Sequence, residues 1–185
     1  MPETPIVIIG PMAAGKSTVA HELALRTGLL QVPFDAVRFY YYLKLGFTFA
    51  EQLAQPDFRS VAEYWRPFHL PAAEALLAEF DEAIIDFGAG HAHFEDEAEI
   101  ARLERILAPV PNVILLMPSE DPVRATEISV QRDRERLGDR WDPSRADMAG
   151  EFVRSESFRR VAKQLVVTEG LTIAESVDRV MAVLR

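Results

Sequence analysis

The chain has 185 residues, of which 20 are lysine or arginine and 29 are aspartate or glutamate, so its formal net charge is −9. A length in this range is typical of a single domain, and a hydrophobic content of 49% excludes a disordered chain. The acidic balance disfavours nonspecific binding to nucleic acid or anionic membranes, and the lack of cysteine excludes disulfide bonds and thiolate metal sites.

Short apolar runs alternate with helix-like segments along most of the chain. The predicted strands are residues 5–9, 29–32, 83–87, 112–117 and 164–168. The predicted helices are residues 17–26, 97–107 and 121–136, and a last helix begins at a capping box formed by Thr172 and Glu175. Strands that alternate with helices indicate a single α/β domain, residues 1–185, with a parallel sheet covered on both faces.

The segment 35–80 interrupts this alternation. It is rich in aromatic residues and predicts helices without a strand between them. An all-helical insertion between two strands is a natural position for a substrate-binding segment. The alternative is that most of these rings pack the helices onto the sheet, because aromatic residues at helical spacing are more often core than pocket.

A glycine-rich loop directly follows the first strand and opens the first helix. It satisfies the pattern G-x-x-x-x-G-K-[ST] with the residues Gly10, Pro11, Met12, Ala13, Ala14, Gly15, Lys16, Ser17 and Thr18. Glycines let the backbone turn sharply and aim its N–H groups at phosphate oxygens, and the helix adds the positive end of its dipole. The Lys16 ammonium and the Ser17 hydroxyl are then suited to the phosphates and the Mg²⁺ ion of ATP.

Two further features fit phosphoryl transfer. Asp86 ends a buried apolar run, where ligands of a parallel sheet collect, and is a candidate Mg²⁺ ligand beside Ser17. The alternative is a strand-end aspartate that caps a turn. Residues 131–142 carry several arginines, among them Arg132 and Arg136, interleaved with acidic residues. This pattern predicts either a lid over the transferred group or a solvated charged helix.

With the phosphate loop included, the sequence resembles shikimate kinase and its small-molecule kinase relatives in the nucleoside-monophosphate-kinase-like group. The stretch 6–18 is nearly this family's phosphate loop, with Ala13 in place of one glycine. The resemblance extends over almost the full length and is most specific at this loop. It implies a three-layer P-loop NTPase fold with a five-stranded parallel sheet in the order 2-3-1-4-5, a helical substrate-binding segment and a lid.

The same resemblance implies roles for residues outside the loop. Asp35 matches the aspartate that holds the acceptor hydroxyl and is the proposed base, and Arg136 matches the arginine that closes over ATP. Arg59 and Arg154 match the arginines that bind a substrate carboxylate. The residues that resemble the triple glycine of the substrate pocket are Gly88, Ala89 and Gly90.

The chain departs from the family pattern at several positions. Pro33 replaces the first aspartate of the family's pair, so that its help to Mg²⁺ must come from elsewhere, such as Asp86. The middle glycine of the triplet is Ala89. His91 and His93 follow where the family requires no histidine. Two histidines at this spacing either ligate a metal or act as polar groups of a loop or pocket, and without a third ligand nearby in sequence we favour the second.

These observations predict an ATP- and Mg²⁺-dependent phosphotransferase that acts on the hydroxyl of a small, anionic metabolite. In this hypothesis Asp35 orients or deprotonates the acceptor, and Arg132 and Arg136 close over the γ-phosphoryl and exclude water. Two alternatives stay open. One is a nucleoside or antibiotic kinase, in which the aromatic segment stacks on a ring, and the other is an ATP-binding switch without a metabolite acceptor.

The sequence also yields expectations about the setting of the protein. The N-terminal residues lack the pattern of a signal peptide, and no apolar run approaches the roughly 20 residues of a membrane span. We therefore expect a cytoplasmic protein, monomeric or homodimeric, whose partner is a small-molecule acceptor rather than nucleic acid or a membrane.

Overall fold

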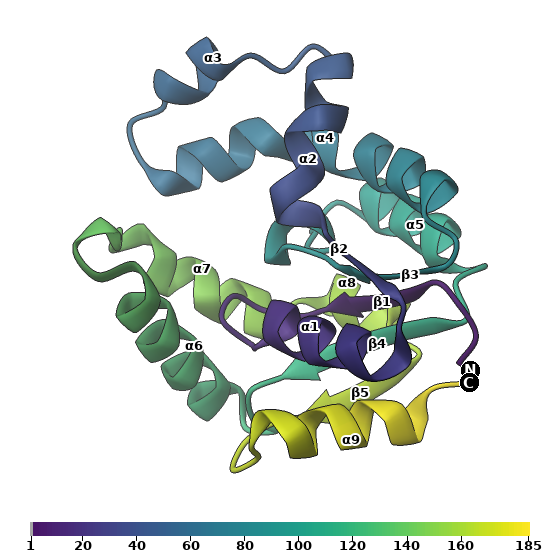
Figure 1. The fold of residues 1–185 in the computed structure, drawn as a ribbon. Coiled ribbons are helices and arrows are strands. Elements are labelled where there is room, and N and C mark those ends of the chain that lie inside the picture. The colour runs from purple at the N-terminus through teal and green to yellow at the C-terminus, as the bar shows by residue number, and fades with distance from the viewer. Residues whose placement is uncertain (1) are drawn as a thin grey trace.

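The computed structural model describes residues 2–185 and contains a five-stranded parallel sheet (Figure 1). The strands are β1 (Ile6–Ile9), β2 (Leu30–Pro33), β3 (Ala83–Asp86), β4 (Asn112–Met117) and β5 (Gln164–Val167). Their order in the sheet is β2-β3-β1-β4-β5, and every neighbouring pair is parallel. The predicted fold class and strand order are confirmed, and each predicted strand agrees with the structure to within one residue at either end.

Helices cover both faces of this sheet (Figure 1). The α-helices are α1 (Lys16–Thr27), α2 (Phe34–Lys44), α3 (Phe49–Leu53), α4 (Phe58–Glu79), α5 (Glu97–Leu107), α6 (Pro122–Leu137), α7 (Ser144–Val153), α8 (Glu156–Val161) and α9 (Ile173–Val183). Two short 3₁₀ helices are η1 (Ala89–His91) and η2 (Gly138–Arg140). The predicted capping box is present at the start of α9, where Thr172 and Glu175 bond each other's backbone.

The core has two halves, one on each side of the sheet. Successive side chains of a strand point to opposite faces. On the central strand β1, Ile6 and Ile8 pack against α1 and α9, whereas Val7 and Ile9 pack against residues of α2, α4, α5, α7 and α8. All four side chains are fully buried. This two-sided burial explains why β1 reads as a continuous apolar run rather than an alternating one.

The segment between β2 and β3 forms α2, α3 and α4 without a strand, as predicted. It stands above the sheet in Figure 1, across from α6 and α7. Most of its rings pack within the core: Phe34 and Tyr42 are fully buried, and Phe47 packs among neighbouring rings. Phe58 and Trp65 instead line a cavity. The segment therefore holds both rings that pack in the core and rings that line a cavity.

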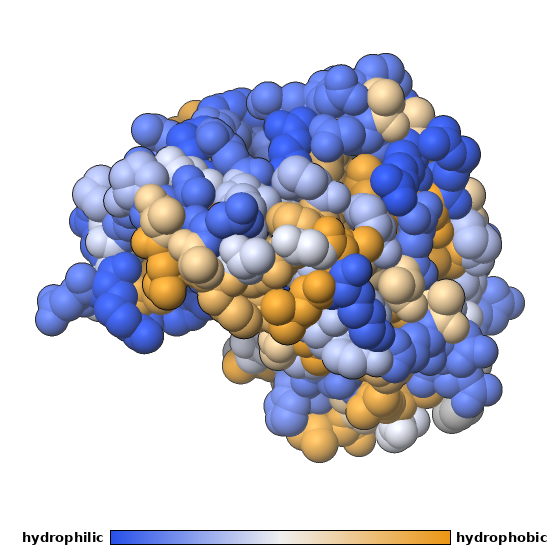
Figure 2. Space-filling view, turned by 90° about the horizontal axis from the view of Figure 1, so that it is seen from above, coloured by the Kyte–Doolittle hydropathy of each residue, from blue (hydrophilic) through white to orange (hydrophobic). Residues whose placement is uncertain are grey.

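Large apolar side chains are also exposed on this helical segment. Viewed from above, the surface carries a band of hydrophobic residues bordered by hydrophilic ones (Figure 2). The large apolar side chains that the segment exposes are Tyr40, Leu43, Leu45, Phe49 and Leu53. None of these helices, and none elsewhere in residues 2–185, combines the length and apolar content of a membrane span.

Candidate active site

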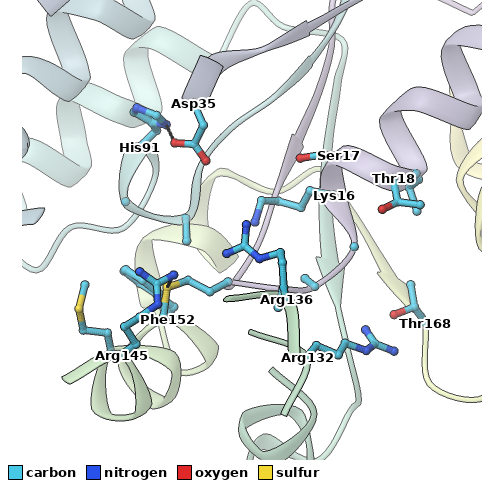
Figure 3. Close-up of a pocket in the computed structure, with 18 of the residues that line it drawn as sticks. Lys16, Ser17, Thr18, Asp35, His91, Arg132, Arg136, Arg145, Phe152 and Thr168 are labelled. Carbon is cyan, nitrogen blue, oxygen red and sulfur yellow. Dashed lines mark hydrogen bonds and ion pairs between the residues drawn. The ribbon is translucent and has the colours of Figure 1, made fainter. Parts of the chain in front are cut away.

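A cavity of about 500 Å³ opens at the carboxyl ends of the strands. It is lined by segments that directly follow strands: the loop after β1, the start of α2 after β2, η1 after β3 and Thr168 after β5. Residues of α4, α6, α7 and α9 complete its walls. Because the carboxyl ends of parallel strands meet at one edge of a sheet, the fold brings these distant segments together. Figure 3 shows the cavity with its polar side chains.

The loop after β1 has the backbone that its glycines predict. Gly10 adopts φ 144° and Gly15 φ 96°, which side-chain-bearing residues rarely adopt. A Cβ atom on Gly10 would lie 2.3 Å from the carbonyl oxygen of Leu116, so that only glycine fits there. Ala13, at the position of a family glycine, also has a positive φ of 54°. Left-handed backbone at a non-glycine residue costs about 1–2 kcal/mol, so the loop keeps this conformation at some expense of stability.

Lys16 is the first residue of α1, and it is almost completely buried. Its Nζ donates hydrogen bonds to the carbonyl oxygens of Gly10, at 3.0 Å, and Pro11, at 2.8 Å. Burial lowers the pKa of Lys16 to about 8, and the nearby carboxylates of Asp35 and Asp86 oppose this shift. A lysine ammonium held beside a glycine-rich loop at the start of a helix is suited to bind the oxygens of a polyphosphate.

Ser17 and Asp86 lie side by side, although 69 positions separate them in the sequence. The Ser17 hydroxyl donates to Asp86 Oδ1 at 3.0 Å, and the Gln31 side chain donates to Asp86 Oδ2 at 2.7 Å. Burial raises the pKa of Asp86, and these two hydrogen bonds oppose it. One hydroxyl and one carboxylate are oxygen donors of the kind that Mg²⁺ takes from a protein when phosphates supply further ligands. The pair therefore fits a Mg²⁺ site beside the loop.

A cluster of three or more histidine, aspartate or glutamate side chains that could hold a metal does not occur within residues 2–185. His91 and His93 in particular point to different surroundings. His91 lines the cavity, whereas the His93 ring lies within hydrogen-bond distance, 2.9 Å, of the Ser155 hydroxyl.

Asp35 occupies the wall opposite the loop, in the first turn of α2 (Figure 3). Its carboxylate packs directly on Gly88, where a Cβ atom would lie 2.2 Å from Asp35 Oδ1. Arg38, one turn further along α2, donates to the same Oδ1 at 2.9 Å. Gly88 therefore serves as the seat of the Asp35 carboxylate and does not itself line the cavity, whereas Ala89 and Gly90 do.

The arginines of α6 approach the loop from the other side. Figure 3 shows the Arg136 side chain directed toward Lys16, with Arg132 further out near Thr168. Both side chains are exposed. The predicted lid, residues 131–142, consists of the last two turns of α6, η2 and the residues that follow.

A buried ion pair joins the C-terminal part of α6 to α7, and it was not predicted from the sequence. Asp133, 1% exposed, accepts hydrogen bonds from Arg145 of α7 at 2.6 Å and from Arg136 at 2.7 Å. Although burial raises the pKa of Asp133, these two arginines lower it below its usual value. Arg145 also lies over the ring of Phe58, 3.9 Å from its centroid, and lines the cavity.

The two arginines expected to bind a carboxylate do not line the cavity. The Arg59 guanidinium makes two hydrogen bonds to the Glu151 carboxylate, at 2.7 and 3.2 Å. Arg154 is exposed at the end of α7. The wall of the cavity on this side is mostly apolar. It is formed by Phe58 and Trp65 of α4 and by Met148 and Phe152 of α7, and its charged member is Arg145, which is paired with Asp133.

Solved structures of known kinases share this fold. Shikimate kinase from Acinetobacter baumannii in complex with shikimate matches with a TM-score of 0.67 at 20% identity, over 98% of this chain and 91% of that one. A gluconokinase from Sinorhizobium meliloti 1021 matches with a TM-score of 0.58 at 17% identity, over 98% and 90%. Thymidylate kinase from Candida albicans matches with a TM-score of 0.50 at 14% identity, over 99% and 92%.

These similarities concern the architecture of the chain. No protein-family model matches the sequence, and no match is found among curated proteins. The chain has the fold of the P-loop kinases, and the expected shikimate-kinase-like architecture is confirmed. Any substrate must be inferred from the cavity itself, because likeness at 13–20% identity shows the fold and does not fix a function.

Proposed function

We propose that the protein transfers the γ-phosphoryl group of ATP to a hydroxyl of a small molecule, with Mg²⁺ as cofactor. The observation that carries this proposal is the convergence, in one cavity, of a complete phosphate loop and the Asp35 carboxylate that faces it. A phosphate loop alone suits any ATP-binding protein. A carboxylate across the cavity adds the group that an alcohol acceptor needs.

Each group has a role in this reaction. The loop N–H groups and the Lys16 ammonium bind the phosphates. Ser17 and Asp86 would hold Mg²⁺, which would supply positive charge beside the phosphates. Asp35 accepts the proton of the acceptor hydroxyl as the hydroxyl oxygen bonds to the γ-phosphorus, and the bond from the γ-phosphorus to the β–γ bridging oxygen breaks, so that ADP leaves. Arg136 and Arg132 lie on the open side of the cavity, where their charge stabilises the transferring group and their closure limits access of water.

Two classes of acceptor fit the sequence, and the cavity favours one of them. An anionic acceptor such as shikimate needs a free cation on the acceptor side, yet Arg59 is paired with Glu151 and Arg145 with Asp133. The apolar wall of Phe58, Phe152 and Trp65 suits an acceptor with an uncharged ring. Among the readings of the sequence, the ring-bearing acceptor of the nucleoside or antibiotic type is therefore the better supported one.

ATP turnover in the presence of candidate acceptors tests this proposal. Shikimate, gluconate, thymidine and uncharged aromatic alcohols would each be incubated with the protein, ATP and Mg²⁺, and ADP formation and product phosphorylation measured. We expect saturable phosphorylation of a ring-bearing alcohol and weak or no phosphorylation of the two acids. If every compound leaves a slow basal hydrolysis unchanged, the protein is an ATP-binding switch and the proposal fails.

The chain offers a matched control for the ATP site. Lys16→Ala is expected to abolish turnover, whereas Lys44→Ala, at the exposed end of α2 and outside the cavity, is expected to leave it unchanged. We further propose that such a kinase works in the cytoplasm, where ATP is supplied, as a monomer or homodimer without nucleic acid or membrane partners.

A further inference from the structure

His91 is a buried group of the cavity that the proposed function does not use. Its side chain is 2% exposed, and Nδ1 is buried without a hydrogen-bond partner within residues 2–185. Asp35 Oδ1 lies 3.9 Å from His91 Nδ1 (Figure 3). Burying a ring nitrogen without a hydrogen-bond partner lowers the stability of the folded state. Such a group in a cavity is therefore a candidate for a functional role.

Two contacts fix the orientation of the His91 ring. The Phe34 ring stacks on it, with centroids 3.8 Å apart and an interplanar angle of 14°. The Tyr42 hydroxyl lies 2.9 Å from His91 Nε2 and also bonds His69 Nδ1. Because Phe34, Asp35 and Tyr42 all belong to α2, one helix holds both the histidine ring and the carboxylate that it faces.

The Asp35 carboxylate indicates which ring nitrogen of His91 carries the proton, because the Tyr42 hydroxyl can either donate to Nε2 or accept from it. Burial lowers the pKa of both His69 and His91 well below their usual value, so each ring is neutral and has one N–H. A bare lone pair on His91 Nδ1 would face the Asp35 carboxylate and be repelled by it. With the proton on Nδ1, Nε2 accepts from the Tyr42 hydroxyl, and the Tyr42 oxygen accepts from His69 Nδ1–H. This arrangement pairs His91 Nε2, the Tyr42 hydroxyl and His69 Nδ1, and it points the Nδ1–H of His91 toward Asp35.

We propose that His91 is a positioning residue that presents its Nδ1–H to Asp35 Oδ1 and thereby directs Asp35 Oδ2 toward the acceptor. This inference rests on the proposed function in that Asp35 is taken as the group that receives the acceptor proton. Arg38 bonds the same Oδ1 from the other side, so that Oδ1 is held and Oδ2 is left for the reaction. At 3.9 Å the two atoms are further apart than a hydrogen bond, but hydrogen bonds of catalytic groups are often long before substrate binds, and we expect Oδ1 to approach Nδ1 in the substrate complex.

Two substitutions separate this role from a purely structural one. The amide of asparagine reaches the position of Nδ1, and the amide of glutamine reaches the position of Nε2. His91→Asn therefore keeps a donor facing Asp35 and loses the contact with Tyr42, while His91→Gln does the reverse. We expect kcat to fall about tenfold in His91→Gln, a part of the 10²–10⁴-fold that general-base catalysis supplies, and to stay near wild type in His91→Asn. The KM for ATP should be unchanged in both.

The rates would be measured with ATP, Mg²⁺ and the acceptor identified in the panel, or with water as acceptor if none is found. A full rate in His91→Gln with a loss in His91→Asn would mean that the ring only anchors Tyr42, and it would overturn the proposal. Equal losses in both variants would overturn it as well, because the donor at the Nδ1 position would then have no special value. Urea unfolding of each variant verifies that it is folded.

A second measurement is independent of turnover. Long-range ¹H–¹⁵N correlation spectra of the ¹⁵N-labelled full chain report which ring nitrogen of His91 is protonated. We expect Nδ1–H in the wild type and a mixture of both tautomers in Asp35→Ala. An Nε2–H tautomer in the wild type would overturn the positioning role even if the protein is a kinase. If the tautomer is Nδ1–H and no ATP turnover is found, the proposed function fails and the interaction between His91 and Asp35 stands.

Discussion

Asp133 and Arg145 form an ion pair that is almost completely buried, with Arg145 Nε 2.6 Å from Asp133 Oδ2. The pair joins α6, which carries Arg132 and Arg136, to α7, which forms the apolar wall of the cavity. Arg136 bonds the other oxygen of the same carboxylate. Asp133 therefore links Arg136 of α6 to Arg145 of α7, on the side of the cavity that carries the apolar wall.

Asp133→Ala is expected to destabilise the protein strongly. Removing one partner of a buried ion pair leaves the other charge uncompensated, which costs about 3–5 kcal/mol. Urea unfolding would measure the loss, with Glu135→Ala as control: Glu135 is exposed on the same helix, and its removal should change stability by less than about 0.5 kcal/mol. Joint replacement by Asp133→Leu and Arg145→Met should recover much of the loss, and an unrecovered double variant would argue against the ion-pair explanation.

Gly88→Ala is expected to lower kcat while leaving ATP binding intact. The added methyl would lie 2.2 Å from Asp35 Oδ1 and 2.6 Å from Oδ2, so that the carboxylate must leave its seat. A displaced general base forfeits part of its 10²–10⁴-fold contribution. Gly150→Ala is the matched control, because Gly150 lies in α7 outside the cavity and its methyl would meet only the end of the exposed Arg154 side chain, at 3.0 Å. Steady-state kinetics of both variants would decide, and equal rates would remove Asp35 from the reaction.

The sequence predicts those parts of this site that depend on local patterns. Buried strands are visible as β-branched runs, and the phosphate loop is visible because its chemistry requires glycines and a lysine at fixed spacing between a strand and a helix. The convergence of Lys16 and Asp35 also follows, since both come directly after parallel strands.

Contacts between distant segments could not be predicted in this way. Asp133 looks like a member of the solvated charged stretch 131–142, because nothing in the sequence shows that α6 and α7 bury it against Arg145. Similarly, His91 and His93 look equivalent in sequence, yet only His91 points into the cavity, where α2 supplies its partners. Side-chain partners of this kind are set by packing of whole helices and not by local pattern.

The proposed class of acceptor predicts different effects on the acceptor KM for two residues of α4, Trp65 and Arg59. If the acceptor stacks on the apolar wall, Trp65→Ala should raise the KM for the acceptor about tenfold or more, since burial of an aromatic ring face is worth about 1–3 kcal/mol. Arg59→Ala should leave this KM nearly unchanged, because Arg59 is paired with Glu151 outside the cavity. The KM for ATP should not change in either variant. A large effect of Arg59→Ala alone would restore the anionic acceptor.

Acidification below pH 6.5 is expected to destabilise the protein through its buried histidines. Burial lowers the pKa of His69, His91 and His93 in the folded state, whereas in the unfolded state they titrate near 6.5. Below pH 6.5 the unfolded state therefore binds more protons, and the free energy of unfolding decreases as pH falls. Each histidine that stays neutral in the folded state contributes up to about 1.4 kcal/mol per pH unit.

Urea unfolding at pH 7.5, 6.5 and 5.5 would measure this slope, in a range where most carboxylates remain ionised in both states. His91→Asn removes one titrating ring and is expected to reduce the slope below pH 6.5, with little change in the slope above it. His21→Asn is the control for the loss of a histidine side chain, because the His21 side chain is exposed on α1. If His91→Asn and the wild type lose stability in parallel, the His91 ring takes up a proton in the folded state, and the neutral tautomer on which the positioning of Asp35 depends would be wrong.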